Sequence, residues 1–238
     1  KMEFKFSNRI SGVQGSAIRE IFKYGNRPEV ISLAGGNPAP ELFPSKEFAE
    51  ILAEILAKKP TEALQYGVTE GYAPLREYVK KFISERENIG RDFDETIIVS
   101  GGQQGIDLAT KVLVNEGDAV IVEEPSFIGA LNAFRAYGAK LVGVPVKNDG
   151  MDIDVLEQKL NETENVKIIY TIPTFQNPSG VTMSEEKRKK LYALAKKHGV
   201  VIIEDNPYGE LTFDGSKVPT IKSGDDEGVV LYSGSFSK

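Results

Sequence analysis

From about residue 96 to residue 232, short runs rich in β-branched residues alternate with segments that have the apolar spacing of amphipathic helices. The strand-like runs are residues 96–99, 119–122, 140–144, 166–170, 200–203 and 229–232, and the helical segments are about 102–114, 126–137, 152–162 and 184–198. Nearly continuous apolar strands that alternate with helices are typical of a mostly parallel sheet covered on both faces. The sequence therefore predicts an α/β fold, a three-layer α-β-α sandwich.

The residues before this alternation follow a different pattern. Residues 1–44 are rich in glycine and proline and predict an extended arm with one short helix at 16–22. Helical apolar spacing then covers residues 45–59 and starts again at about residue 71. We therefore expect an N-terminal arm over residues 1–44 and a large domain over residues 45–238.

Composition argues against several classes of function. A formal net charge of −6 over 238 residues offers no basic surface for nucleic acid. Because cysteine is absent and His198 is the only histidine, thiol chemistry, histidine triads and multi-histidine metal sites are excluded. No run reaches the roughly 18 apolar residues that a membrane span needs. We expect a cytoplasmic protein that binds no metal, nucleic acid or membrane.

The strand ends are where a ligand site is expected, because ligands of parallel sheets bind beyond the carboxyl ends of the strands. The first strand-like run is followed by small residues that lead into a helix, Ser100-Gly101-Gly102-Gln103-Gln104-Gly105. Backbone N–H groups and the positive end of a helix dipole suit a phosphate at such a turn. Taken alone this is a weak signal, since the dinucleotide-binding glycine spacing is missing.

Three more strand ends carry aromatic or polar side chains. Phe127 follows the second run, where it either packs in the core or forms a platform for a ligand ring. Asn177 lies in a proline-containing turn after the fourth run. Asp205 and Tyr208 follow the fifth run. Asp205 either caps a turn or pairs with a cationic heterocycle, for which a half-buried carboxylate near a phenol is suitable.

The sixth run ends in Ser233-Gly234-Ser235-Phe236-Ser237-Lys238, which places hydroxyl groups beside an amine. Such a stretch is either a chain end without function or an anion site next to a reactive lysine. Together, the strand ends fit a ligand with a phosphate, a flat ring, a ring atom that needs a carboxylate, and a carbonyl that condenses with lysine. Pyridoxal phosphate (PLP) has all four features.

Three motifs carry a resemblance to a known family. Asn-Pro-x-Gly at 177–180, Asp-x-x-Tyr at 205–208 and Ser-x-Ser-Lys at 235–238 resemble, in order and spacing, those of the class I/II aminotransferases of PLP fold type I. The segments that look most like the 2-aminoadipate, kynurenine and multi-substrate aromatic aminotransferase branch are residues 35–44, 64–67, 100–105 and 124–127. The resemblance implies a homodimeric enzyme of amino acid metabolism, active in biosynthesis, that moves an amino group from an amino acid to a 2-oxo acid such as 2-oxoglutarate.

The resemblance also implies a role for each matched residue. Lys238 would form the aldimine with the cofactor and then shuttle a proton at the substrate Cα. Asp205 would keep the pyridine nitrogen protonated, and Asn177 and Tyr208 would hydrogen-bond the ring 3′-oxygen. The other implied cofactor contacts are Phe127 on the ring face and, around the phosphate, Gly102, Gln103, Ser235 and Ser237.

Three residues outside these motifs are implied in substrate and subunit contacts. Tyr66 would reach the phosphate of the neighbouring subunit, while Arg19 and Gly36, together with Asn177, would line the substrate pocket. Members of the family continue beyond their lysine into a smaller C-terminal domain, which carries the arginine that binds the substrate α-carboxylate. We therefore expect the 238-residue chain by itself to be incomplete and inactive.

Two other functions are compatible with these motifs. The same scaffold supports PLP-dependent lyases and synthases, because the cofactor supplies the chemistry and the pocket selects the bond. A non-catalytic, PLP-binding regulatory domain fused to a DNA-binding domain is the other alternative. The acidic charge and the arm-like pattern at the first residues favour the aminotransferase.

Overall fold

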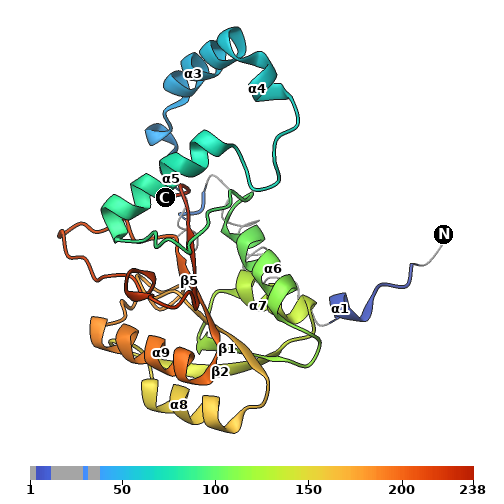
Figure 1. The fold of residues 1–238 in the computed structure, drawn as a ribbon, viewed down its shortest axis with the longest axis vertical. Coiled ribbons are helices and arrows are strands. Elements are labelled where there is room, and N and C mark those ends of the chain that lie inside the picture. The colour runs from blue at the N-terminus through green and yellow to red at the C-terminus, as the bar shows by residue number, and fades with distance from the viewer. Residues whose placement is uncertain (1–3, 12–28, 32–37) are drawn as a thin grey trace. The chain divides into compact units, whose positions relative to one another are not determined.

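The computed structural model describes residues 4–11, 29–31 and 38–238 (Figure 1). The chain divides into two compact units, one made of Lys1–Gln14 and Pro74–Lys238 and the other of Gly15–Ala73. The proposed boundary at residue 44 between arm and large domain stays a prediction. The short helix expected at 16–22 lies outside the described residues.

The larger unit is built on a six-stranded sheet with the strand order β3-β2-β1-β4-β5-β6. The strands are β1 (Ala119–Glu124), β2 (Lys140–Lys147), β3 (Gly150–Met151), β4 (Val166–Thr171), β5 (Val201–Asn206) and β6 (Val230–Gly234). All neighbouring strands pair in parallel except β2 and the short β3, which are antiparallel. The mostly parallel sheet predicted from the sequence is confirmed.

Helices cover both faces of this sheet (Figure 1). The helices are α6 (Gly102–Leu113) and α7 (Ile128–Ala136) on one face, and α8 (Ile153–Glu162) and α9 (Glu185–His198) on the other. Successive strand residues point to opposite faces, so Ile202 packs in the α8–α9 layer and Ile203 in the α6–α7 layer. The predicted three-layer sandwich is therefore confirmed, with one apolar core on each face.

Local sequence explains where the helices on the α8–α9 face begin and end. The side chains of Asp152 and Ser184 accept hydrogen bonds from the backbone N–H groups of Val155 and Lys187, each at 3.4 Å, and so cap the first turns of α8 and α9. Gly199 ends α9 with a left-handed backbone, φ 65°, which glycine adopts without steric cost.

The expected strand at residues 96–99 is wrong for the structure. This segment has no regular secondary structure, and no described strand pairs with it. Its backbone instead makes other hydrogen bonds: Arg76 of α5 (Ala73–Glu87) donates from Nε to the Thr96 carbonyl oxygen at 2.6 Å, and the Gly101 N–H donates to the Val99 carbonyl oxygen at 2.9 Å. β-branched composition favours an extended backbone, but a strand also needs a neighbouring strand to complete its hydrogen bonds.

The smaller unit contains the 3₁₀ helix η1 (Pro40–Leu42) and helices α3 (Ser45–Lys58) and α4 (Pro60–Leu64). The helix predicted at 45–59 is confirmed, whereas α4 was not predicted. The apolar side of α3 is solvent-exposed in the described structure: Phe48, Ile51, Leu52, Ile55 and Leu56.

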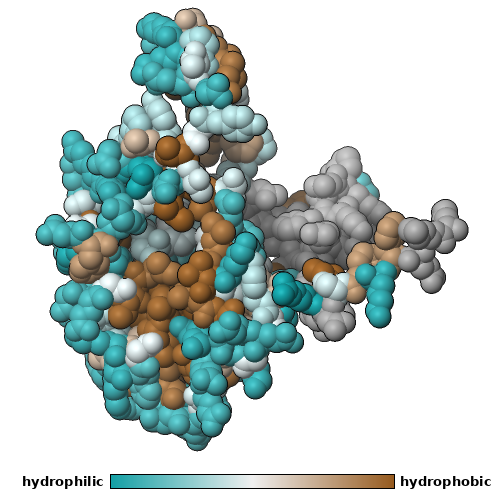
Figure 2. Space-filling model, turned by 45° about the vertical axis from the view of Figure 1, so that its right-hand side comes forward, coloured by the Kyte–Doolittle hydropathy of each residue, from teal (hydrophilic) through white to brown (hydrophobic). Residues whose placement is uncertain are grey.

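Exposed apolar side chains also occur in the larger unit. The exposed ones between α5 and the end of the chain include Phe93, Ile97, Val112, Phe213, Leu231 and Phe236. Figure 2 shows apolar side chains gathered on one face of the molecule and bordered by hydrophilic ones. Among the described residues, no helix combines the length and hydropathy required to cross a membrane.

Candidate functional site

The candidate site lies at the carboxyl ends of β4, β5 and β6, beside the N-terminus of α6. The β5–β6 register places Asp205 opposite Ser233. A Cβ atom built on Gly102 would lie 3.6 Å from Ser233 Oγ and 4.0 Å from Asp205 Oδ1. The first turn of α6 therefore comes close to the end of β5. The structure thus brings together the predicted Gly102 and Asp205, which are about a hundred residues apart in the chain.

Asp205 is the buried carboxylate of this site. Its side chain is 7% exposed, and its Oδ2 accepts a hydrogen bond from the Tyr170 hydroxyl at 2.8 Å. Burial raises the pKa of Asp205 to about 6, while the bond from Tyr170 acts in the opposite direction. A carboxylate held in this way favours a cation in front of it, because a positive charge would offset the cost of desolvation.

Asn177 and Tyr208 contact each other at the candidate site. The Asn177 Nδ2 atom donates to the Tyr208 hydroxyl at 3.3 Å, and both residues are half-buried. Their elements are the turn after β4 and the segment after β5, which the parallel pairing of these strands brings side by side. The pair predicted from two separate motifs is therefore a contact in the structure.

The turn that carries Asn177 is anchored by Glu123, a residue that the sequence did not mark as part of the site. Glu123 is buried at the end of β1 and accepts hydrogen bonds from Thr171 Oγ1 at 2.7 Å and Gln176 Nε2 at 3.2 Å. Gln176 Nε2 also donates to the Pro125 carbonyl oxygen at 2.8 Å. Burial raises the pKa of Glu123 to about 7. This network fixes the turn beside Asn177 against the loop that leads to Phe127.

Phe127 and Gln103 converge on the backbone of Gly129. Gln103 Nε2 donates to the Gly129 carbonyl oxygen at 3.0 Å, and a Cβ atom on Gly129 would come within 2.5 Å of both Gln103 Oε1 and Phe127 Cζ. A larger residue at position 129 would force the side chains of Gln103 and Phe127 to move. The Phe127 ring also packs against the α6–α7 core, so it is partly a core residue while lying next to the predicted phosphate-binding turn.

The segment after β6 carries the remaining predicted residues. The hydroxyl groups of Ser235 and Ser237 lie 2.6 Å apart, and the Ser237 N–H donates to Ser235 Oγ at 3.1 Å. The ring of Phe236 lies 6.2 Å from that of Phe82 on α5, centroid to centroid. Lys238 follows Ser237 and is exposed. The two serines form a compact hydroxyl cluster directly before the lysine.

Comparison with known families identifies the family of this chain. The sequence profile described as "Aminotransferase class I and II" matches residues 28–238, most of the chain. The chain belongs to the aminotransferase class I and II family.

The relatives of this aminotransferase-family chain carry the names of the branch expected from its motifs. It is 47% identical to aromatic-amino-acid aminotransferase 1 of Thermococcus litoralis, covering 98% of this chain and 57% of that protein. It is 42% identical to the 2-aminoadipate transaminase of Thermus thermophilus, covering 98% and 58%. A solved kynurenine aminotransferase of Pyrococcus horikoshii, in complex with PMP, KYN as substrates and KYA as products, has a TM-score of 0.91 and 43% identity over 98% of this chain and 58% of its own.

The family and the branch predicted from the motifs are confirmed, and so is the fold of an aminotransferase large domain. The chain spans somewhat less than three fifths of the length of these relatives.

Three predicted residues of this aminotransferase-family chain belong to the smaller unit, Gly15–Ala73. Tyr66 lies in the smaller unit, after α4, and its side chain is 99% exposed. Arg19 and Gly36 lie outside the described residues. Their expected contacts with substrate and with a second subunit stay predictions.

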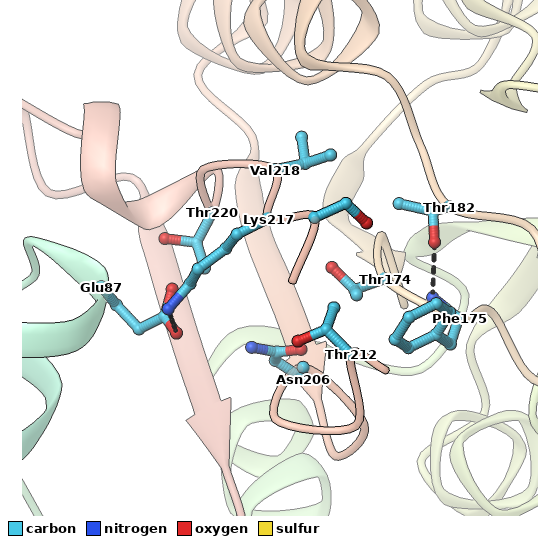
Figure 3. A pocket seen from close by; sticks show the side chains of 11 residues that line it. Glu87, Thr174, Phe175, Thr182, Asn206, Thr212, Lys217, Val218 and Thr220 are labelled. Carbon is cyan, nitrogen blue, oxygen red and sulfur yellow. Dashed lines mark hydrogen bonds and ion pairs between the residues drawn. The ribbon is translucent and has the colours of Figure 1, made fainter. Parts of the chain in front are cut away.

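A separate pocket lies on the opposite face at the end of β5 (Figure 3). It is lined by Asn206, whose side chain points away from the face of Asp205, and by Thr174, Thr182, Thr212 and Thr220 among others. The ion pair between Lys217 Nζ and Glu87 Oε1, 2.6 Å long, lies at its side. None of the residues predicted for the site lines this pocket.

Proposed function

We propose that the protein containing this chain is a PLP-dependent aminotransferase. It would transfer an amino group from an amino acid to a 2-oxo acid such as 2-oxoglutarate, with an aromatic, 2-aminoadipate-like or broad range of donors. The observation that carries the proposal is the buried Asp205 carboxylate, which lies beside the first turn of α6 at the sheet edge where the Asn177–Tyr208 pair also lies.

The side chains of the site fit this cofactor by their chemistry. A protonated pyridine nitrogen suits Asp205, since the carboxylate is buried and its hydrogen-bond partner is the neutral phenol of Tyr170. The hydroxyl cluster of Ser235 and Ser237 suits a phosphate, as do the backbone groups at the start of α6. The ring of Phe127 is available for stacking on an aromatic heterocycle.

When bound, PLP supplies an electron sink for the charge that develops at the substrate Cα. Lys238 would take the proton from that Cα with its Nζ atom and then donate it to carbon C4′ of the cofactor. Asp205 would hold the proton on the ring nitrogen, and Tyr208 and Asn177 would orient the ring through its 3′-oxygen. The residues that would bind the phosphate are Gly102, Gln103, Ser235, Ser237 and, from a second subunit, Tyr66.

The substrate and the assembly belong to the same proposal. The names of the relatives, an aromatic, a 2-aminoadipate and a kynurenine aminotransferase, support donors with large side chains. Arg19 and Gly36 are the residues of this chain proposed for that side-chain pocket. A homodimer with shared sites, a role in amino acid biosynthesis and a cytoplasmic location complete the proposal.

Replacing Lys238 with alanine in the full-length protein tests this function. Turnover with an amino acid and 2-oxoglutarate should fall by more than about a thousandfold, because the proton-transferring amine is removed. Lys111→Ala, an exposed lysine on α6, is the matched control and should retain activity. Turnover of the Lys238 variant at the wild-type rate would refute the assignment.

A further inference from the structure

Tyr170 is a buried residue in contact with the site whose chemistry the proposed function has not used. It lies on β4, its side chain is fully buried, and its hydroxyl donates to Asp205 Oδ2 at 2.8 Å. A buried Tyr–Asp hydrogen bond of this length is charge-assisted and therefore stronger than a bond between neutral groups.

The sheet register explains how Tyr170 reaches Asp205. Tyr170 pairs with Ile203, so Asp205 lies two residues further along β5 on the same face of the sheet. The phenol of Tyr170 reaches diagonally across from β4 to this position on β5. Its ring is held in place by Phe134 of α7, with ring centroids 5.5 Å apart and an interplanar angle of 68°. The hydroxyl position is thus set by a packed core and not by a mobile loop.

The two oxygens of Asp205 therefore have different surroundings. Oδ2 is occupied by the Tyr170 hydroxyl, whereas Oδ1 lies on the side of Gly102 at the start of α6. Rotation of the carboxylate about its terminal bond would break the bond to Tyr170. The arrangement leaves Oδ1 as the oxygen that faces the candidate site.

We propose that Tyr170 is a positioning residue of the cofactor site, which fixes the Asp205 carboxylate so that Oδ1 receives the cationic ring nitrogen of PLP. This inference rests on the proposed function and adds a residue outside the three sequence motifs. Tyr170 does not touch the reacting atoms; it acts through Asp205.

The charges around the pair are consistent with this role. Burial and the neighbouring Asp205 raise the pKa of Tyr170 well above its ordinary value, so the phenol stays a donor. Glu123 at the end of β1 and Tyr208 after β5 also act on Tyr170 and raise its pKa. Because the bond from Tyr170 lowers the pKa of Asp205 against the effect of burial, removing the hydroxyl should raise that pKa above about 6.

Tyr170→Phe in the full-length protein separates positioning from packing, since it keeps the ring against Phe134 and removes only the hydroxyl. We expect PLP affinity, measured by fluorescence titration of the apoprotein, to fall by about tenfold. The pH at which affinity reaches half of its maximum should also move upward, a change that a purely structural role would not cause. Tyr192→Phe is the matched control: it removes a phenol that donates to Asp226 Oδ1 at 2.6 Å on the other face, and PLP affinity should not change.

A second variant keeps the test decisive if Tyr170→Phe does not fold. Replacing Tyr170 with 3-fluorotyrosine makes the phenol a stronger donor at nearly the same size, and PLP binding should then become tighter with its pH midpoint moved downward. Unchanged affinity and pH dependence in the variant that folds would overturn the role of Tyr170. If the wild-type protein itself failed to bind PLP, the proposed function would be refuted instead.

Discussion

Glu204 and Asp205 are consecutive carboxylates at the end of β5, and they face opposite layers of the molecule. Glu204 is fully buried in the α8–α9 layer and accepts the backbone N–H groups of Ile221 and Lys222 at 2.8 and 2.7 Å. Asp205 is almost as buried in the α6–α7 layer, but within the described part of the chain its hydrogen-bond partner is a single phenol, on one oxygen. Burial raises the pKa of Glu204 to about 7 and that of Asp205 to about 6.

The difference lies in how completely each carboxylate is satisfied. Both oxygens of Glu204 receive backbone donors, so this residue anchors the loop that contains η2 (Lys222–Gly224). Asp205 keeps one oxygen directed toward the edge of the sheet where ligands of parallel sheets bind. A similar degree of burial thus accompanies a carboxylate with both oxygens hydrogen-bonded on one face and the proposed cofactor-binding carboxylate on the other.

The largest expected effect comes from Asp205, the proposed cofactor-binding carboxylate. Asp205→Ala in the full-length protein should lower PLP affinity and turnover by more than about a hundredfold, because the buried ring nitrogen loses its counter-charge. The thermal stability of the apoprotein should change little or rise, since a buried carboxylate is removed. Measurements of PLP affinity and of Cα-proton exchange test the first expectation, and the melting temperature of the apoprotein tests the second. Proton abstraction at the wild-type rate would contradict the assignment.

Replacing Glu204 should have the opposite result, a loss of stability without a loss of PLP affinity. Glu204→Gln should lower the free energy of unfolding by about 1–3 kcal/mol, because an amide cannot accept both backbone N–H groups and leaves one of them unpaired. PLP affinity of the folded variant should stay close to wild type. Urea denaturation and a PLP titration measure the two quantities. A loss of PLP affinity as large as that of Asp205→Ala would contradict the different roles proposed for Glu204 and Asp205.

The smallest effect is the pH dependence of apoprotein stability. The pKa values of Glu204 and Asp205 in the folded state are about 7 and about 6, above their ordinary values of 4.5 and 3.8. The folded chain therefore holds protons that the unfolded chain has released, and the contribution of these groups is complete at low pH and lost as the pH rises through their folded pKa values.

Between about pH 5 and pH 7, each of these groups should give a slope of at most about 1.4 kcal/mol per pH unit. Glu123 adds to this slope with the same sign, because burial raises its pKa to about 7. Glu204→Gln and Asp205→Asn should each flatten the curve measured by urea denaturation at several pH values. Stability that rises with pH over this range in the wild-type apoprotein would show that these carboxylates are ionised in the folded state.

Most of the fold was predictable because the signals are local. Five of the six strand-like runs are strands, and the four helices between them lie within a few residues of their predicted positions. The exception, residues 96–99, shows the limit of this reasoning. Its β-branched residues favour extension, yet strand formation depends on a partner that is remote in sequence.

The site was predictable to the extent that its residues occur in short motifs. Asn177, Asp205 and Tyr208 were identified in this way, and the structure brings the first and last into contact. Tyr170 and Glu123 were not predicted, because their contacts with the candidate site come from side chains that reach across strands. The sequence signals that mark them are weak. Tyr170 is the last residue of one strand-like apolar run, and Glu123 is one of two acidic residues that follow a different strand-like run.

Local sequence patterns are sufficient to predict the alternation of strands and helices, the strand ends that carry the candidate site and the family to which the chain belongs. These features depend on periodicity and on closely spaced motifs, which can be recognised without knowing the tertiary contacts of the residues. Only the tertiary structure decided which carboxylate at the end of β5 is satisfied and which is open. Strand register and the packing of Tyr170 against Phe134 set that difference, and both depend on residues far apart in the chain.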